Sequence, residues 1–131
     1  MFVSKIAGAL FVIGSLLFAS PEAYGATLSG DQIRDRIVNR TIYLRIPTGG
    51  EFPLQYRSNG QVTGDGTKVG LARFFAPKET GKWWIDGNRM CQQFPTWYRG
   101  RTFCFTLQDV GSANRLGWTR DDGRSGVARV E

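Results

Sequence analysis

The chain has 131 residues, of which 41% are hydrophobic and 13% aromatic, and this composition excludes a disordered polar chain. Seventeen lysines and arginines against eleven acidic residues, with no histidine, give a formal net charge of +6 at pH 7. Such a charge favours anionic partners without identifying one, and general solubility would also explain it. The absence of histidine excludes the commonest general base and any Ser-His or Cys-His nucleophile.

The N-terminal residues have the pattern of a targeting segment. Lys5 precedes an apolar run from Ile6 to Phe18 that is too short to span a bilayer, and a small-x-small site follows at Ala23-Tyr24-Gly25. We therefore predict a cleavable signal peptide over residues 1–25. The mature domain, residues 26–131, would be periplasmic or secreted and would not span a membrane. A neighbouring cleavage position and a retained signal anchor stay open as alternatives.

The only two cysteines, Cys91 and Cys104, lie in the predicted mature domain. An oxidising compartment favours a disulfide between them, and their spacing does not match a CxxC redox pair. A loop of this size would contribute roughly 3 kcal/mol to stability in the loop-entropy model. Without histidine or further cysteines a zinc site would lack its usual ligands, so we expect no metal and no cofactor.

A short helix is predicted at the start of the mature domain. Ser29 and Gln32 have the spacing of a capping box, and Leu28 and Ile33 flank them as a hydrophobic staple. The helix should begin there and end near Asn39.

After this helix the apolar residues alternate with polar ones, as in half-buried strands. Pro53 suggests an edge strand or a bulge, and Asp86-Gly87 between two apolar runs is typical of a hairpin turn. Strands are expected at 41–46, 52–56, 69–76, 81–85, 89–94, 102–107, 115–120 and 126–130. The prediction is a mainly β fold, a small antiparallel meander of seven or eight short strands preceded by one helix. Closure as a barrel and folding as a sandwich both stay open.

Three segments together resemble a known family: LSGDQIRDRIVNRTI near the start, GKWWIDGNRMCQQFPTWYRGRTFCF, and RDDGRSGVA near the end. This pattern resembles the DUF995-like family, small exported alphaproteobacterial proteins of unknown function. The residues that carry the resemblance are Leu28, Ser29, Gly30, Gln32, Ile33, Gly81, Trp83, Asp86, Gly87, Cys91 and Cys104. The resemblance implies a bacterial periplasmic location and the β fold, and it carries no activity.

No arrangement of acidic and basic residues predicts catalysis. Asp121 and Asp122 are adjacent, so in a strand their side chains would point to opposite faces, and an Asp-Gly turn explains both. The Gly64-Asp65-Gly66 segment lacks the framework of a phosphate loop. We therefore expect that the protein is not an enzyme.

The best candidate for a binding surface lies between the two cysteines. Trp97, Tyr98, Arg99 and Arg101 place two large aromatic rings beside two guanidinium groups in a predicted loop. Aromatic faces stack on sugar rings, and arginine forks bind carboxylate or phosphate. In the alternative interpretation Trp97 folds back over the disulfide and the arginines are only solvated.

We expect a noncatalytic, envelope-associated binding module whose partner is an anionic or glycan component of the envelope. Two alternatives remain open: a protein-interaction factor, such as an inhibitor or accessory subunit, and a calycin-like carrier with a small ligand inside the barrel. The carrier would need a cavity, and a filled core would argue against it. Nucleic acid is not an expected partner, because the protein is predicted to be exported.

Overall fold

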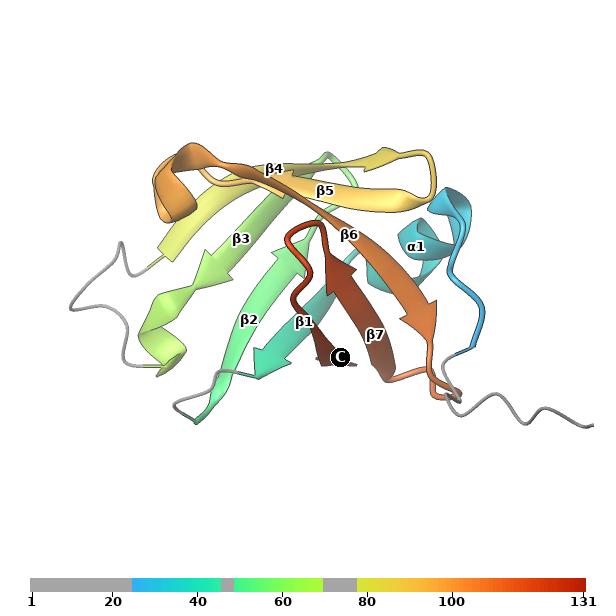
Figure 1. The fold of residues 1–131 in the computed structure, drawn as a ribbon. Coiled ribbons are helices and arrows are strands. Elements are labelled where there is room, and N and C mark those ends of the chain that lie inside the picture. Colours follow the sequence, from blue (N-terminus) through green and yellow to red (C-terminus); the bar gives the residue numbers. More distant parts are fainter. Residues whose placement is uncertain (1–24, 46–48, 70–77) are drawn as a thin grey trace, which may run out of the picture.

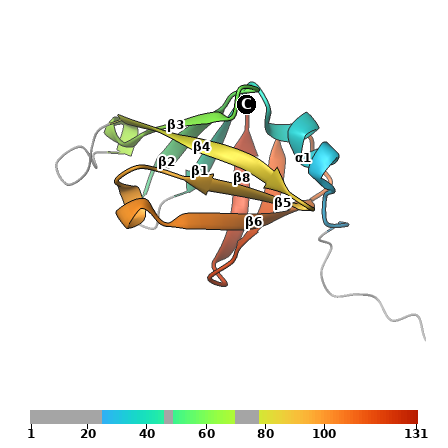
Figure 2. The same cartoon turned by 90° about the horizontal axis from the view of Figure 1, so that it is seen from above.

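The protein is a closed antiparallel β-barrel with one helix against its end (Figures 1 and 2). The computed structural model describes residues 25–45, 49–69 and 78–131. The elements in chain order are α1 (Gly30–Ile37), β1 (Arg40–Arg45), β2 (Glu51–Tyr56), β3 (Gln61–Asp65), β4 (Lys78–Asp86), β5 (Arg89–Gln93), β6 (Thr102–Asp109), β7 (Arg115–Arg120) and β8 (Ser125–Val130). Short 3₁₀ segments follow β3 at Gly66–Val69 and β5 at Trp97–Gly100.

Each strand pairs with the next one along the chain, and β8 returns to β1 to close the barrel. The closing register joins Ile42 to Val130 and Tyr43 to Arg129. This arrangement confirms the mainly β fold and decides for a barrel over a sandwich. Because every strand has two neighbours, the sheet has no free edge strand.

The helix is the element whose ends agree best with the sequence. Both bonds of the capping box are present: the Ser29 hydroxyl accepts from the Gln32 amide, and the Gln32 side chain accepts from the Ser29 amide. Leu28 and Ile33 are both buried, as the staple requires. The helix ends at Ile37, two residues before Asn39, which has a left-handed φ of 60°.

The two ends of the barrel are closed by different elements. α1 lies against the β4–β5 and β6–β7 turns, where the Gly30 amide donates to Asn88 Oδ1 at 3.3 Å and the Arg36 guanidinium donates to the Ser112 and Arg115 carbonyls. We call this the helix end. The β5–β6 and β7–β8 connections lie at the opposite end, because successive connections of an up-and-down barrel alternate between its ends. We call that end the loop end.

Large apolar side chains from alternate strand positions fill the interior. The buried residues include Ile33, Ile37, Ile42, Leu54, Tyr56, Val62, Trp83, Met90, Phe103, Phe105, Leu107 and Leu116. The Tyr56 hydroxyl lies among them and donates to Gln92 Oε1 at 2.5 Å, and burial raises the pKa of Tyr56 above its usual value. As the alternation predicts, Trp83 is buried in the core and its neighbour Trp84 is half-exposed.

Two strand predictions need correction. β2 is not an edge strand, because it pairs with both β1 and β3. Its register with β3 begins only at Leu54, so Pro53 has a register partner in β1 and none in β3. Its missing N–H therefore interrupts no pairing with β3. β3 was not predicted, because Gln61–Asp65 contains one large apolar residue and a glycine. In the expected strand at 69–76, Val69 ends a 3₁₀ segment and the remaining positions lie outside the described residues.

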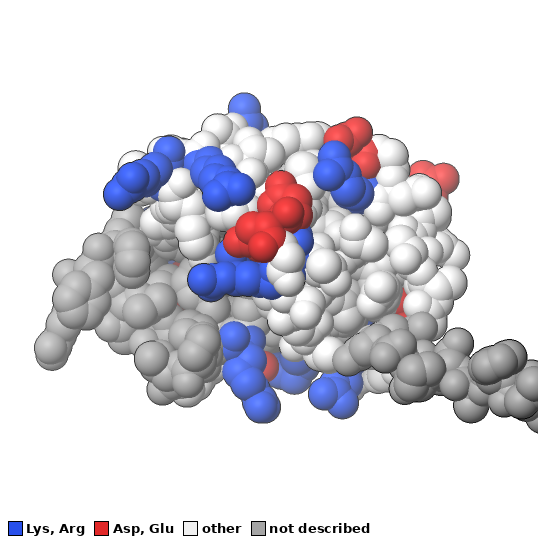
Figure 3. All heavy atoms as spheres, viewed as in Figure 1, with Lys and Arg blue, Asp and Glu red and all other residues white. Residues whose placement is uncertain are grey.

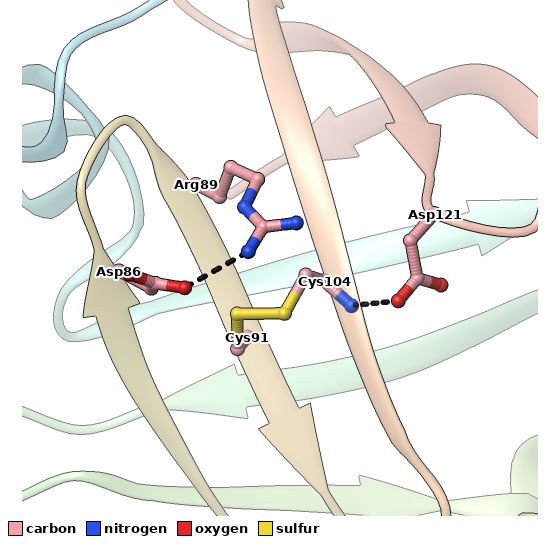
Figure 4. The surroundings of a disulfide bond; sticks show 5 residues. All are labelled: Asp86, Arg89, Cys91, Cys104 and Asp121. Atoms are coloured by element: carbon pink, nitrogen blue, oxygen red, sulfur yellow. Dashed lines mark hydrogen bonds and ion pairs between the residues drawn. A yellow bond between two sulfur atoms is a disulfide. The ribbon is translucent and has the colours of Figure 1, made fainter.

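The predicted disulfide is confirmed. Cys91 in β5 and Cys104 in β6 are direct register partners, with Cα atoms 4.0 Å apart (Figure 4). The same view shows the Asp86–Arg89 ion pair at the β4–β5 turn and the Cys104 amide donating to an Asp121 carboxylate oxygen at 3.3 Å. With its eight-residue α1, the described part of the chain provides no helix of the length and apolarity that a bilayer crossing needs.

Candidate functional site

The predicted binding residues all lie in the β5–β6 connection, residues 94–101, at the loop end of the barrel (orange in Figures 1 and 2). The structure separates them into two groups. Trp97 is only 8% exposed, whereas Tyr98 is 60% exposed and Arg99 and Arg101 are also exposed. Trp97 is therefore a core residue, and its place in the proposed contact set is wrong.

Trp97 turns inward because the barrel offers space at this position. Its ring packs against Phe52 at 5.3 Å and Phe94 at 4.7 Å between ring centroids. A Cβ built on Gly64 would lie 2.4 Å from Trp97 Cζ3, so the indole occupies the space that any larger residue would fill. Trp97 thus closes the loop end of the barrel and contacts its interior, not the disulfide as the alternative interpretation proposed. Its buried Nε1 has no hydrogen-bond partner among the described residues.

Glu79 of β4 anchors the connection. One carboxylate oxygen accepts from the Thr96 amide and hydroxyl, both at 2.8 Å, and the other accepts from the Trp97 amide at 3.0 Å. Hydrogen bonds to a charged acceptor are stronger than neutral ones. Glu79 therefore fixes the backbone immediately before the exposed residues.

The backbone of the exposed residues Tyr98 and Arg99 has a left-handed conformation. Tyr98 has φ 54°, Arg99 has φ 56° and Gly100 has φ 72°, so two successive non-glycine residues are left-handed. This conformation costs an L-residue roughly 1–2 kcal/mol. Strain of this kind often occurs at functional positions, where surrounding contacts maintain it. Tyr98 and Arg99, the two left-handed non-glycine residues of this turn, are both exposed.

We call Tyr98, Arg99 and Arg101 the Tyr98 surface. The Arg99 and Arg101 side chains form no ion pair with any described residue. Figure 3 shows lysine and arginine side chains spread over this face, including the side where the β5–β6 connection lies, while the acidic clusters lie toward the centre and the opposite side. The Tyr98 surface is therefore available to a negatively charged partner.

Behind this surface lies an aromatic support that the sequence did not indicate. The guanidinium groups of Arg101 and Arg120 lie over the Phe103 ring, 4.9 Å and 4.2 Å from its centroid. Tyr98 meets the same ring edge-on at 5.1 Å. Arg120 lies in β7 opposite Phe105 and two residues after Trp118, so it shares the inward face of the strand. Extending the alternation of inward and outward residues along β7 to its last residue would have predicted this position from the sequence.

Unlike Arg99 and Arg101, Arg120 already has a carboxylate partner within the protein. It donates to both carboxylate oxygens of Asp122, at 2.8 Å and 2.6 Å, and this pairing lowers the pKa of Asp122 to about 2. The carboxylate therefore stays ionised and paired down to strongly acidic pH. Asp121 accepts from the Cys104 amide, so both aspartates stabilise the β7–β8 turn, as the sequence predicted.

The described residues enclose little empty space. A cavity of about 30 Å³ lies inside the barrel, next to Tyr56, Gln92 and Phe105. A groove of about 610 Å³ lies outside, over β1–β4, where Thr41, Gln55 and Thr63 contribute polar side chains. Neither space is lined by the Tyr98 surface. No group of three or more potential metal ligands occurs in the described part of the chain.

Comparison with protein-family models, with curated proteins and with solved structures finds no match to this chain. The resemblance to the DUF995-like family stays a prediction from the residues quoted above. The candidate site therefore depends on its own geometry.

Proposed function

We propose that this protein is an exported, noncatalytic module that binds an anionic component of the cell envelope through the Tyr98 surface. The observation that carries the proposal is the left-handed turn, which holds an exposed tyrosine next to two arginines without carboxylate partners. Guanidinium groups bind carboxylate and phosphate, and the tyrosine ring offers a stacking face for a sugar.

The alternatives receive less support. A carrier would need an interior cavity of several hundred Å³, and the cavity within the described barrel is about 30 Å³. That volume holds a water molecule or two, not a ligand. A protein-interaction factor would dock through the 94–101 loop or through a free sheet edge; the closed barrel offers no such edge, so only the loop remains for it. The Tyr98 surface remains the best-supported place for a partner.

The proposal is tested by sedimentation with protease-treated envelope fragments. The exported protein should pellet with the fragments at low salt and stay in solution at about 1 M salt, where the Debye length falls to about 3 Å. The triple variant Tyr98→Ala, Arg99→Ala, Arg101→Ala should pellet much less and melt within a few degrees of wild type.

A matched control removes two exposed arginines at the helix end, Arg40→Ala with Arg57→Ala, neither of which forms an ion pair within the described chain. This control should sediment like wild type. Equal sedimentation of the triple variant and wild type would contradict the proposed site. Equal losses in the control and the triple variant would show that only net charge matters.

A further inference from the structure

The Tyr98 surface lines neither the interior cavity nor the outer groove, and Tyr98 is 60% exposed, so the surface suits a partner with a broad face. We propose that the Tyr98 surface docks on the face of an anionic lipid bilayer. The proposal deepens the proposed function and depends on it, since it names the anionic partner of the same residues.

The small apolar area at the surface disfavours a protein partner. Tyr98 and Val127 are the only large hydrophobic residues among the described ones that are exposed, and Val127 belongs to β8. A stable protein interface usually buries about 800 Å² on each partner around an apolar centre. One tyrosine ring with arginines beside it supplies no such centre. At a bilayer, however, tyrosine is favoured at the level of the lipid headgroups.

The charges fit the same partner. Neither nearby carboxylate forms an ion pair with Arg99 or Arg101: Asp122 pairs with Arg120, and Glu79 keeps its negative charge while it accepts from neutral donors of Thr96 and Trp97. The two arginines of the Tyr98 surface therefore present positive charge that no described carboxylate neutralises. An anionic leaflet attracts such cations when they lie within about a Debye length, roughly 10 Å at 0.1 M salt.

A bilayer and a discrete ligand make different demands on the two arginines. A bilayer face attracts any cation, so lysine can replace arginine there. A site that recognises one phosphate or carboxylate uses the planar fork of arginine, which lysine lacks. The pair of variants Arg99→Lys, Arg101→Lys and Arg99→Ala, Arg101→Ala therefore separates the two kinds of partner.

The test is sedimentation of the exported protein with lipid vesicles. The N-terminus of the exported protein is first determined by mass spectrometry. Phosphatidylcholine vesicles with and without phosphatidylglycerol are compared. We expect binding only to the anionic vesicles and loss of binding at about 1 M salt. The double alanine variant should bind roughly thirtyfold more weakly, and the double lysine variant within about threefold of wild type. Tyr98→Ala should also weaken binding, and the Arg40→Ala, Arg57→Ala control should not.

Binding to neutral vesicles equal to that to anionic vesicles, or no binding to either, would overturn the bilayer proposal. A double lysine variant as weak as the double alanine variant would also overturn it, in favour of a discrete anionic ligand. Sedimentation with envelope fragments from which organic solvent has removed the lipid distinguishes failure of the bilayer proposal from failure of the proposed function. If wild type still sediments with them through the Tyr98 surface but ignores vesicles, the proposed function stands and the bilayer proposal fails. If it binds neither, both fail.

Discussion

Trp97 and Tyr98 are neighbours in the chain, yet their side chains have opposite environments. Trp97 is buried against Phe52 and Phe94, and Tyr98 is the most exposed aromatic residue that the structure describes. The change of direction occurs within one residue because Tyr98 takes a left-handed backbone conformation. Sequence reasoning placed both residues on one surface, since nothing in the local pattern predicts such a turn at a tyrosine.

This difference can be measured as stability. Trp97→Ala should lower the free energy of unfolding by about 3–5 kcal/mol, because it removes a buried ring and leaves a cavity above Gly64. Tyr98→Ala should cost less than about 1 kcal/mol, since the ring is largely exposed and loses mainly its edge contact with Phe103. Chemical denaturation of both variants checks this. Comparable losses would mean that the two residues share one environment in solution.

The strands and the helix differ in how clearly their local signals define them. α1 carries its start signal in its own residues, because the capping box is satisfied within four consecutive positions. β3 has no such signal. It forms because Val62 and Gly64 register with β2 and β4 and because Gly64 leaves room for Trp97. A strand whose stability comes from its neighbours is not visible in its own sequence.

The disulfide ties the two strands that flank the β5–β6 connection. Because it joins direct register partners in β5 and β6, Cys91→Ser and Cys104→Ser should each lower the free energy of unfolding by about 2–5 kcal/mol. The double variant should be no less stable than the weaker single variant, since both remove the same bond. Denaturation of the three variants under oxidising conditions provides the measurement. Additive losses would show that the cysteines stabilise the fold separately.

At the scale of the whole molecule, the residues that follow the predicted cleavage site lie against β6. The Leu28 amide donates to the Leu107 carbonyl at 2.8 Å, and Thr27 bridges to Gln108, so the residues after the site pair with β6. The predicted mature N-terminus, Ala26, would therefore lie beside the barrel wall.

Mass spectrometry of the exported protein checks both processing and oxidation. We expect a chain that begins near Ala26 and is lighter by two hydrogen atoms than its reduced form, because export favours the disulfide seen between β5 and β6. Reduction with a thiol should restore that mass. A full-length chain with two free thiols would contradict the predicted signal peptide and the predicted location.

The sequence by itself determined the features that depend on residues close together in the chain. The α1 cap, the Asp86-Gly87 turn and the alternation of Trp83 with Trp84 arise from local geometry, and each is present in the structure. The tertiary structure alone decided that the sheet closes, that Trp97 fills one end of it, and that Arg120 lies over the Phe103 ring behind the exposed surface. Closure depends on the pairing of β1 with β8, whose residues lie far apart in the chain. Burial of Trp97 depends on the space above Gly64 on another strand, and such complementary shapes exist only once the strands are assembled.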